Sequence, residues 1–330
     1  MLGFRLLLIK ILIISAICIC KVTSTYSMTN DESDILHGEQ KDNDEVPVLK
    51  GFENSELFPR PGVCGPISAK MFLNVYGGSE ASLGDFTWLA NLEYKTDDGD
   101  LEVACAGNII NKRYILTAAH CVTGEILIKK GQLVSVRVGD HNIDTAKDCN
   151  EYVCIDPPQY LGIEKVIAHE NYRKVMGKRG SVNDIALLRV DRDIEYSKSV
   201  APVCLPSVVP TLKPLEPGMK LTAAGWGHIG SRSYSPVKLT VSLPYVANEN
   251  CTLSVDESHL CAGGRFREDT CSGDSGGGIF RLHHLELFQA PFIWIIEGIV
   301  SYGRGCGLEE PSVYTRVTSF MDWIQQNVLE

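Results

Sequence analysis

A serine flanked by glycines stands out in the C-terminal part of the chain, in Cys271-Ser272-Gly273-Asp274-Ser275-Gly276-Gly277. Glycines on both sides let the backbone turn tightly and approach a substrate, and amide N–H groups in such a turn can point at a developing oxyanion. Taken alone, the stretch also fits a glycine-rich loop around an ordinary turn serine. Ser275 is therefore a candidate nucleophile that needs partners elsewhere in the sequence.

Two further motifs supply those partners. Thr117-Ala118-Ala119-His120-Cys121 places a histidine in a run of small residues, and Asn183-Asp184 precedes an apolar run at 185–188. A serine hydroxyl needs a base to become a nucleophile, and the base needs a carboxylate to hold its tautomer and stabilise the imidazolium. A single histidine is more often structural, but three motifs in the order His120, Asp184, Ser275 predict nucleophilic acyl transfer.

The elements that must position these residues are short strands. From Tyr76 onward, apolar runs such as 88–90, 133–136 and 299–300 alternate with turns marked by Gly and Pro. This pattern is typical of an all-β barrel or sandwich. The exception is the stretch from Phe320 to Val328, where apolar residues at 320, 321, 324 and 328 predict an amphipathic helix.

Composition narrows the class of protein. The chain has 330 residues, 44% of them hydrophobic and 22% charged, which excludes a collagen, a disordered chain and a multi-span membrane protein. A net charge of −10 argues against nucleic-acid binding, which requires a basic face. Twelve cysteines are too many for an ordinary cytosolic enzyme and indicate an oxidising compartment.

The first 24 residues are predicted to be a secretory signal peptide. An apolar stretch that ends at Cys20 is followed by the small residues Val22-Thr23-Ser24, so we expect cleavage after Ser24. A membrane anchor is the alternative, but the apolar run is shorter than the ~20 residues that a span requires. Cleavage leaves ten cysteines, an even number that suits a disulfide framework and lacks the paired spacing of zinc ligands.

Residues 25–74 are predicted to be a pro-segment. Acidic residues crowd the stretch from Asp31 to Glu45, and Pro59 and Pro61 follow. No strand or helix pattern appears up to residue 63, so we expect a solvated segment with little core of its own. The remaining residues, 75–330, form the predicted catalytic domain.

The motifs carry a resemblance to a known family. Over residues 75–330 the sequence resembles chymotrypsin-fold, trypsin-like serine proteases, and within them the arthropod clip-type cascade proteases (prophenoloxidase-activating enzyme and Easter-like). The closer likeness rests on Val75-Tyr76-Gly77-Gly78, on Asp148-Cys149 with Cys154, and on 163–167 and 201–206. The resemblance implies two six-stranded antiparallel β-barrels and a C-terminal α-helix, with the candidate residues between the barrels. Cys64 is the only cysteine of the pro-segment, which therefore lacks the six-cysteine clip module of many relatives.

The resemblance also implies five disulfides that use every cysteine left after residue 24. Cys64–Cys204 would tether the pro-segment after cleavage. The other four pairs would lie within the protease domain: Cys105–Cys121, Cys149–Cys154, Cys251–Cys261 and Cys271–Cys306.

Substrate specificity follows from the same resemblance. Asp269, six residues before Ser275, falls where trypsin-like relatives carry the carboxylate that recruits a substrate Arg or Lys. Gly303 matches a glycine of the pocket wall, while Ser312 replaces a second glycine and would project into the pocket. The N–H groups of Gly273 and Ser275 would form the oxyanion hole. A surface acid is the alternative interpretation of Asp269.

Activation in the family frees an amine that pairs with the aspartate before the nucleophile, here Val75 and Asp274. The residue before the cut is Asn74, where Arg or Lys is usual. Cutting at the nearest basic residue, Lys70, would leave four extra residues. An Asn-tolerant activating protease, later trimming and the absence of activation all remain open.

Two further motifs are candidate sites. Asp140, Asn142, Asp144 and Asp148 are oxygen donors in the loop where relatives often bind calcium, and a solvated acidic loop is an equal alternative. Asn250-Cys251-Thr252 is a glycosylation sequon. No motif indicates an organic cofactor, and none is predicted to be required.

The sequence thus predicts a secreted, extracellular serine endopeptidase, made as a zymogen, that cleaves after Arg or Lys in a proteolytic cascade. Its predicted partners are protein substrates, an upstream activating protease and serpin-type inhibitors, with no nucleic acid and no membrane. A non-catalytic regulator on the same fold is the alternative, kept open by Asn74 and Ser312. A digestive trypsin is disfavoured by the acidic pro-segment and its tethering cysteine.

Overall fold

The computed structural model describes residues 57–67, 78–175, 180–228, 234–285 and 292–329. The predicted signal peptide, most of the pro-segment and the Asn74–Val75 bond lie outside these residues. The chain divides into units 1–50 and 51–330, and all that is described belongs to the second. Within the described ranges, no helix has the length and apolar character needed to cross a membrane.

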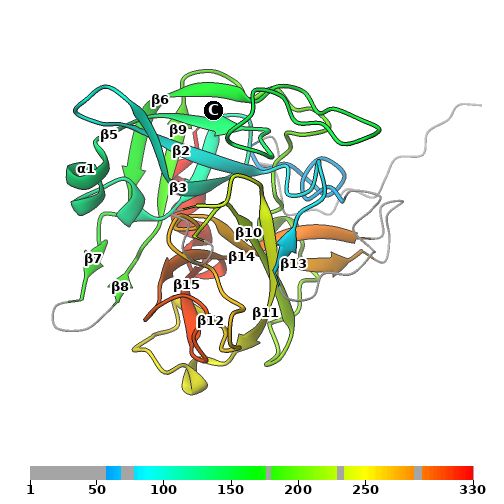
Figure 1. The fold of residues 1–330 in the computed structure, drawn as a ribbon. Coiled ribbons are helices and arrows are strands. Elements are labelled where there is room, and N and C mark those ends of the chain that lie inside the picture. Colours follow the sequence, from blue (N-terminus) through cyan, green and yellow to red (C-terminus); the bar gives the residue numbers. More distant parts are fainter. Residues whose placement is uncertain (1–56, 68–77, 176–179, 229–233, 286–291, 330) are drawn as a thin grey trace, which may run out of the picture. The chain divides into compact units, whose positions relative to one another are not determined.

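The first half of the described chain forms a closed antiparallel barrel (Figure 1). Its strands neighbour one another in the order β2-β3-β4-β9-β6-β5. They alternate apolar and polar residues or are apolar throughout, and their inward side chains, such as Leu92, Leu116 and Leu187, are fully buried. The bounds are β2 (Leu89–Lys95), β3 (Leu101–Ile109), β4 (Tyr114–Thr117), β5 (Gln132–Val138), β6 (Gln159–Ala168) and β9 (Ala186–Val190).

The second half closes a second ring of six strands, which lies below the first barrel in Figure 1. The order is β11-β10-β13-β14-β15-β12, the pairing of β11 with β12 completes the ring, and β1 (Ser79–Glu80) adds to β11. The bounds are β10 (Lys220–Gly225), β11 (Leu239–Val246), β12 (His259–Gly263), β13 (Gly278–His284), β14 (Phe292–Tyr302) and β15 (Pro311–Arg316). The predicted fold of two six-stranded barrels is confirmed.

The remaining elements are short. The C-terminal helix is confirmed, as η4 (Val317–Phe320) followed by α2 (Met321–Asn327), and it returns to the first barrel, where Leu329 N donates to Tyr114 Oη at 3.1 Å. The helix α1 (Glu125–Lys130) follows the candidate histidine and was not predicted. The others are η1 (Ala119–Cys121), β7 (Arg173–Lys174), β8 (Ser181–Val182), η2 (Pro206–Val208) and η3 (Asn248–Asn250).

Aromatic rings join the two barrels. Trp88, directly before β2, packs edge-on against Phe280 of β13, with ring centroids 5.2 Å apart, and lies tilted against Trp294 of β14 at 6.4 Å. Phe86 contacts both partners, at 6.1 Å and 5.6 Å. Large buried aromatic side chains dominate the energetics of such interfaces. The barrels are therefore held by a continuous apolar core rather than by a flexible hinge.

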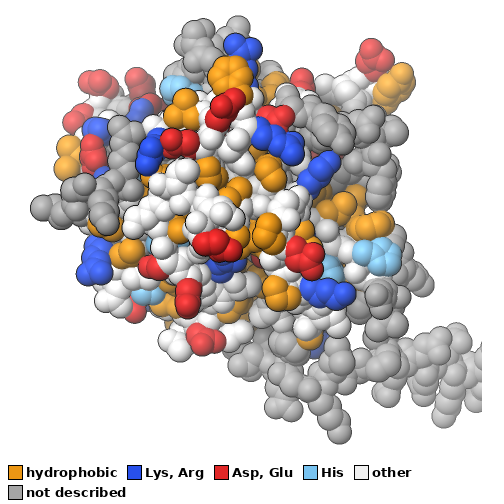
Figure 2. Space-filling model, turned by 90° about the horizontal axis from the view of Figure 1, so that it is seen from below, with side chains coloured by type: hydrophobic (Ala, Val, Ile, Leu, Met, Phe, Trp, Pro, Cys, Tyr) orange, Lys and Arg blue, Asp and Glu red, His pale blue; other side chains and the backbone are white. Residues whose placement is uncertain are grey.

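Five disulfides brace the described chain, and they are the five pairs that the resemblance implies: Cys64–Cys204, Cys105–Cys121, Cys149–Cys154, Cys251–Cys261 and Cys271–Cys306. Each bridge of this kind contributes ~2–4 kcal/mol by restricting the unfolded chain. On the face seen in Figure 2, acidic and basic side chains are interspersed with hydrophobic ones. The acidic side chains therefore do not form one continuous negative patch on that face.

Candidate active site

His120 and Asp184 form a hydrogen-bonded pair. Asp184 Oδ2 lies 2.8 Å from His120 Nδ1, and Asp184 Oδ1 accepts from the backbone N–H of His120 at 2.9 Å. The two contacts fix the imidazole ring relative to its own backbone. His120 Nε2 lies 3.7 Å from Cys121 Sγ and makes no stronger hydrogen bond among the described residues. That nitrogen is therefore available to take a proton.

Both barrels position the Asp184 carboxylate. Asn183 adopts a left-handed backbone (φ 53°), which asparagine tolerates better than most residues, and this turn places Asp184 at the entrance of β9. Ser301, on β14 of the second barrel, donates its hydroxyl to Asp184 Oδ2 at 2.5 Å. Thr315, on β15, donates to the Asp184 carbonyl at 2.8 Å.

The electrostatics keep Asp184 ionised. Its side chain is almost fully buried, and burial alone would raise its pKa. The opposite charge of His120, and hydrogen bonds from His120 and Ser301, outweigh this effect and hold the pKa of Asp184 below its ordinary value. A carboxylate in that state stabilises an imidazolium at His120.

The Ser275 loop docks against the first barrel. Ala106 N donates to the Ser275 carbonyl at 2.8 Å, and Asn108 Nδ2 donates to the Gly276 carbonyl at 3.1 Å. Gly276 has φ +79°, and a Cβ there would collide with Thr117 Oγ1 and with the Ala106 carbonyl. Only glycine fits, so the sequence signal at Gly276 has a steric cause. This docking brings Ser275 to the segment that carries His120.

The N–H groups of Gly273 and Ser275 are the predicted oxyanion-hole donors. Gly273 has φ +99°, and a Cβ there would lie 3.1 Å from Gly227 Cα. Within the described part of the chain, the N–H groups of Gly273 and Ser275 donate to no protein acceptor. They are free to stabilise negative charge on a substrate carbonyl oxygen, which is usually a large part of catalysis in acyl transfer.

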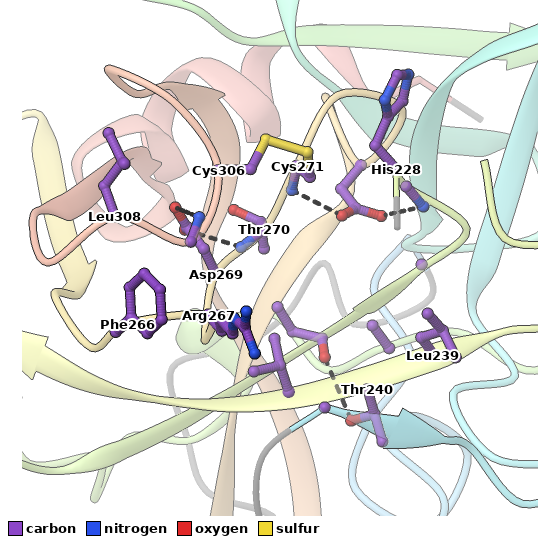
Figure 3. Close-up of a pocket in the computed structure, with 18 residues that line it drawn as sticks. His228, Leu239, Thr240, Phe266, Arg267, Asp269, Thr270, Cys271, Cys306 and Leu308 are labelled. Atoms are coloured by element: carbon purple, nitrogen blue, oxygen red, sulfur yellow. Dashed lines mark hydrogen bonds between the residues drawn. A yellow bond between two sulfur atoms is a disulfide. The ribbon is translucent and has the colours of Figure 1, made fainter. Parts of the chain in front are cut away.

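Asp274 borders a cavity of about 620 Å³ (Figure 3). Its two oxygens accept backbone N–H groups of Gly227 at 2.8 Å and Cys271 at 2.9 Å. Burial nevertheless raises the pKa of Asp274 to about 6. The carboxylate is therefore undercompensated in the uncut chain. Its predicted partner, the Val75 amine, lies outside the described residues.

The predicted specificity residues do not all line one pocket. A cavity of about 270 Å³ beside Ser275 is lined by Gly303 and Ser312, as expected. Asp269 lines the adjoining larger cavity of Figure 3, which shares Thr270, Cys271 and Cys306 with the smaller one. Ser312 Oγ donates to Asp269 Oδ1 at 2.8 Å, so the serine hydroxyl separates the carboxylate from the substrate cavity.

Two of the predicted calcium ligands, Asp140 and Asp148, belong to a buried cluster of charges. Two bases in this cluster are buried, Arg137 and Lys238, together with four acids: Asp85, Glu93, Asp140 and Asp148. Arg137 pairs with Glu93 at 3.3 Å and with Asp140 at 3.1 Å, and burial lowers the pKa of Lys238 to about 8. The cluster thus holds two more acids than bases.

Asp140 is incompletely compensated in this cluster. Its carboxylate is buried and pairs with Arg137, but burial still raises its pKa to about 6. Asp148 accepts from Thr145 and from the amides of His141 and Asn142. The incomplete compensation of Asp140 and the excess acid fit a divalent cation held by Asp140 and Asp148.

Three other residues complete the comparison with the sequence. The Asn142 side chain accepts from Asp144 N at 3.1 Å, and Asp144 accepts from Tyr234, so neither points to the cluster. Asn250 is exposed at the end of η3, where a glycan has room. Sequence reasoning missed Ser301, although it lies two residues before Gly303, which was predicted to form the pocket wall.

Comparisons with known proteins agree with this geometry. A family model described as Trypsin matches residues 75–324. The chain is 42% identical over 265 residues to CLIP domain-containing serine protease B10 of Anopheles gambiae, covering 77% of this chain and 69% of that protein. It is 38% identical over 294 residues to phenoloxidase-activating factor 1 of Holotrichia diomphalia, covering 86% and 77%. Among solved structures it resembles the Drosophila Grass clip serine protease of the Toll pathway, with a TM-score of 0.67 and 32% identity over 82% of this chain and 75% of that one.

The buried Asp274 carboxylate predicts a pH-dependent stability of the uncut protein. Its folded pKa of about 6 exceeds the unfolded value near 3.8, so the fold favours the protonated form. The stabilising contribution is complete below the unfolded value and is lost as the pH rises through about 6. An Asp274→Asn variant has no titratable group at this position, so its unfolding free energy in urea should fall by about 1–3 kcal/mol less between pH 4 and 7 than that of the unmodified chain.

The matched control is Asp322→Asn, at an exposed carboxylate of α2. This variant should show the same change in unfolding free energy between pH 4 and 7 as the unmodified chain. Asp140 and Asp269 also have raised pKa values and will keep part of the slope in the Asp274 variant. An Asp274→Asn protein with the full original slope would contradict this assignment.

Proposed function

The chain belongs to the trypsin family of serine proteases and is a trypsin-like serine endopeptidase, and from this premise we propose that it is a secreted zymogen that cleaves proteins after basic residues. The observation that carries the proposal is the His120–Asp184 pair, with the Ser275 loop docked beside it. The five disulfides support an oxidising, extracellular location.

The geometry supports the following mechanism. Ser275 Oγ attacks the scissile carbonyl while His120 Nε2 takes its proton, and Asp184 stabilises the imidazolium that forms. The amides of Gly273 and Ser275 hold the oxyanion. His120 then protonates the leaving amine, and a water molecule hydrolyses the acyl-enzyme at Ser275 by the same steps.

The chain divides by function in this proposal. Residues 1–24 form a signal peptide, 25–74 form the acidic pro-segment, and 75–330 form the protease domain. The Cys64–Cys204 disulfide would keep the pro-segment attached after cleavage at Asn74–Val75. The new amine of Val75 would supply the cation that Asp274 lacks in the uncut chain.

Partners are proteins in this proposal. Relatives are named as a phenoloxidase-activating factor and as a clip protease of the Toll pathway. By that likeness we place this chain in an extracellular proteolytic cascade, downstream of an activating protease, upstream of a protein substrate and subject to serpin-type inhibitors.

Replacement of the nucleophile tests the enzyme assignment. Ser275→Ala should lower kcat for peptide hydrolysis by several orders of magnitude while the chain is still secreted and folded, because the variant lacks the hydroxyl of the proposed nucleophile. The control is Ser319→Ala, at an exposed serine of η4. Undiminished hydrolysis by purified Ser275→Ala protein would refute the role of Ser275.

Replacement of the residue before the cut tests activation. Asn74→Arg should let trypsin cleave before Val75 and create activity, which N-terminal sequencing and active-site titration can follow. A protein cleaved at Val75 that stays inert toward substrates and titrants would instead identify a non-catalytic regulator on the same fold.

The activated form should lose activity at alkaline pH. An α-amine has an unfolded pKa of ~7.7–8.0, and pairing with Asp274 should raise it in the fold. The contribution of the pair is then complete below that unfolded value and lost as the pH rises through the folded one. Adding Asp274→Asn to the Asn74→Arg chain should abolish activity after cleavage.

We also propose structural calcium at Asp140 and Asp148. Calcium at a hundredfold excess over its Kd should stabilise the protein by about 2.7 kcal/mol in thermal unfolding relative to EDTA. Asp140→Asn should remove this shift, whereas Asp144→Asn, at the exposed partner of Tyr234, should retain it. An equal calcium response in both variants would contradict the site.

A further inference from the structure

Ser312 stands between the substrate cavity and the only acid expected to recognise substrate. It is 7% exposed, lines the cavity beside Ser275, and donates its hydroxyl hydrogen to Asp269 Oδ1 at 2.8 Å. The lone pairs of Ser312 Oγ are not used in that bond, so they remain for a donor in the cavity. A cationic side chain that enters beside Ser275 would meet this oxygen before it meets the carboxylate.

The Asp269 carboxylate is already occupied by three donors. Its Oδ1 accepts both Ser312 Oγ and Thr270 N, at 2.8 Å each, and its Oδ2 accepts Gly307 N at 3.3 Å. Burial still raises its pKa above the ordinary value, so these neutral donors do not fully compensate the charge. The carboxylate therefore still favours a cation nearby, although its Oδ1 offers little room for another N–H group.

Arginine and lysine respond differently to this arrangement. A guanidinium binds a carboxylate best through two parallel N–H···O bonds, one to each oxygen. The two donors on Asp269 Oδ1 obstruct that geometry. An ammonium is a compact charge with three rotatable donors, so it can donate to Ser312 Oγ while remaining close to Asp269.

The cavity is also narrow at this depth. Gly303 faces Ser312, and a Cβ on Gly303 would lie only 2.9 Å from Ser312 Oγ. Arg304 lines the same cavity, and its guanidinium pairs with Glu310 at 3.2 Å. The longer and wider arginine head group therefore has less room than lysine.

We propose that Ser312 makes the substrate pocket select lysine over arginine at the residue before the cleaved bond. The proposal rests on the proposed function, since it presupposes cleavage after basic residues. It deepens that function by naming the substrate class and the residue that sets it.

The test uses the full chain carrying Asn74→Arg, cleaved by trypsin, freed of trypsin and titrated for active sites. Three peptide substrates identical except for Lys, Arg or Phe before the cleaved bond are compared by kcat/KM. We expect the order Lys, Arg, Phe. Ser312→Gly should shift the Lys-to-Arg ratio about tenfold or more toward arginine, the range that small changes in a pocket produce.

Ser312→Ala separates the hydroxyl from its steric bulk, and it keeps the test valid if the glycine variant does not fold. It should lose lysine turnover through the missing acceptor and should gain arginine turnover less than Ser312→Gly does. Ser319→Ala should keep the original ratio.

The inference would be overturned if the unmodified protein preferred arginine, or if neither Ser312 variant changed the Lys-to-Arg ratio of kcat/KM. Either result would leave the proposed cleavage after basic residues intact. A preference for Phe, or no turnover by a fully titrated protein, would overturn both.

Discussion

The structure depends on how the charges of its buried carboxylates are compensated. A buried carboxylate is costly unless donors or cations compensate it. The Asp184 carboxylate is compensated from both sides, because His120 belongs to the first barrel and Ser301 to the second, while Thr315 of the second barrel holds the Asp184 backbone carbonyl. The charge is stable only when the barrels are docked. The His120–Asp184 pair and the interface between the barrels are therefore one structure, and changes to the aromatic core reach the reactive groups.

Much of the fold and part of the site could be predicted from the sequence. The motifs around His120, Asp184 and Ser275 are local, and their small residues reflect steric needs such as the collision that a Cβ on Gly276 would cause. The helix at the C-terminus was visible because its apolar spacing is local as well. The disulfide pairing came from the family resemblance, since ten cysteines alone permit many pairings.

The rest depends on contacts between segments far apart in the chain. Ser301 reaches Asp184 across 117 residues, and Ser312 reaches Asp269 across 43. Neither hydrogen bond has a periodic or local signature. Motif reasoning placed Asp269 on the pocket floor because the residue type matched, but whether its oxygens face the substrate depends on the side chain at 312. The helix α1 has only six residues, too few for a clear periodic pattern.

The buried acids differ in how completely they are compensated, and this difference separates their roles. Asp184 has a lowered pKa and a full set of donors, so it serves as a fixed support for His120. Asp274, Asp269 and Asp140 have raised pKa values because burial exceeds what their neighbours supply. Each of the three therefore gains most from a cation that arrives from outside the described fold. The proposed cations differ in kind: a chain terminus for Asp274, a substrate side chain for Asp269 and a metal ion for Asp140. In the proposed function, incomplete compensation of a buried carboxylate thus accounts for activation at Asp274, specificity at Asp269 and stability at Asp140.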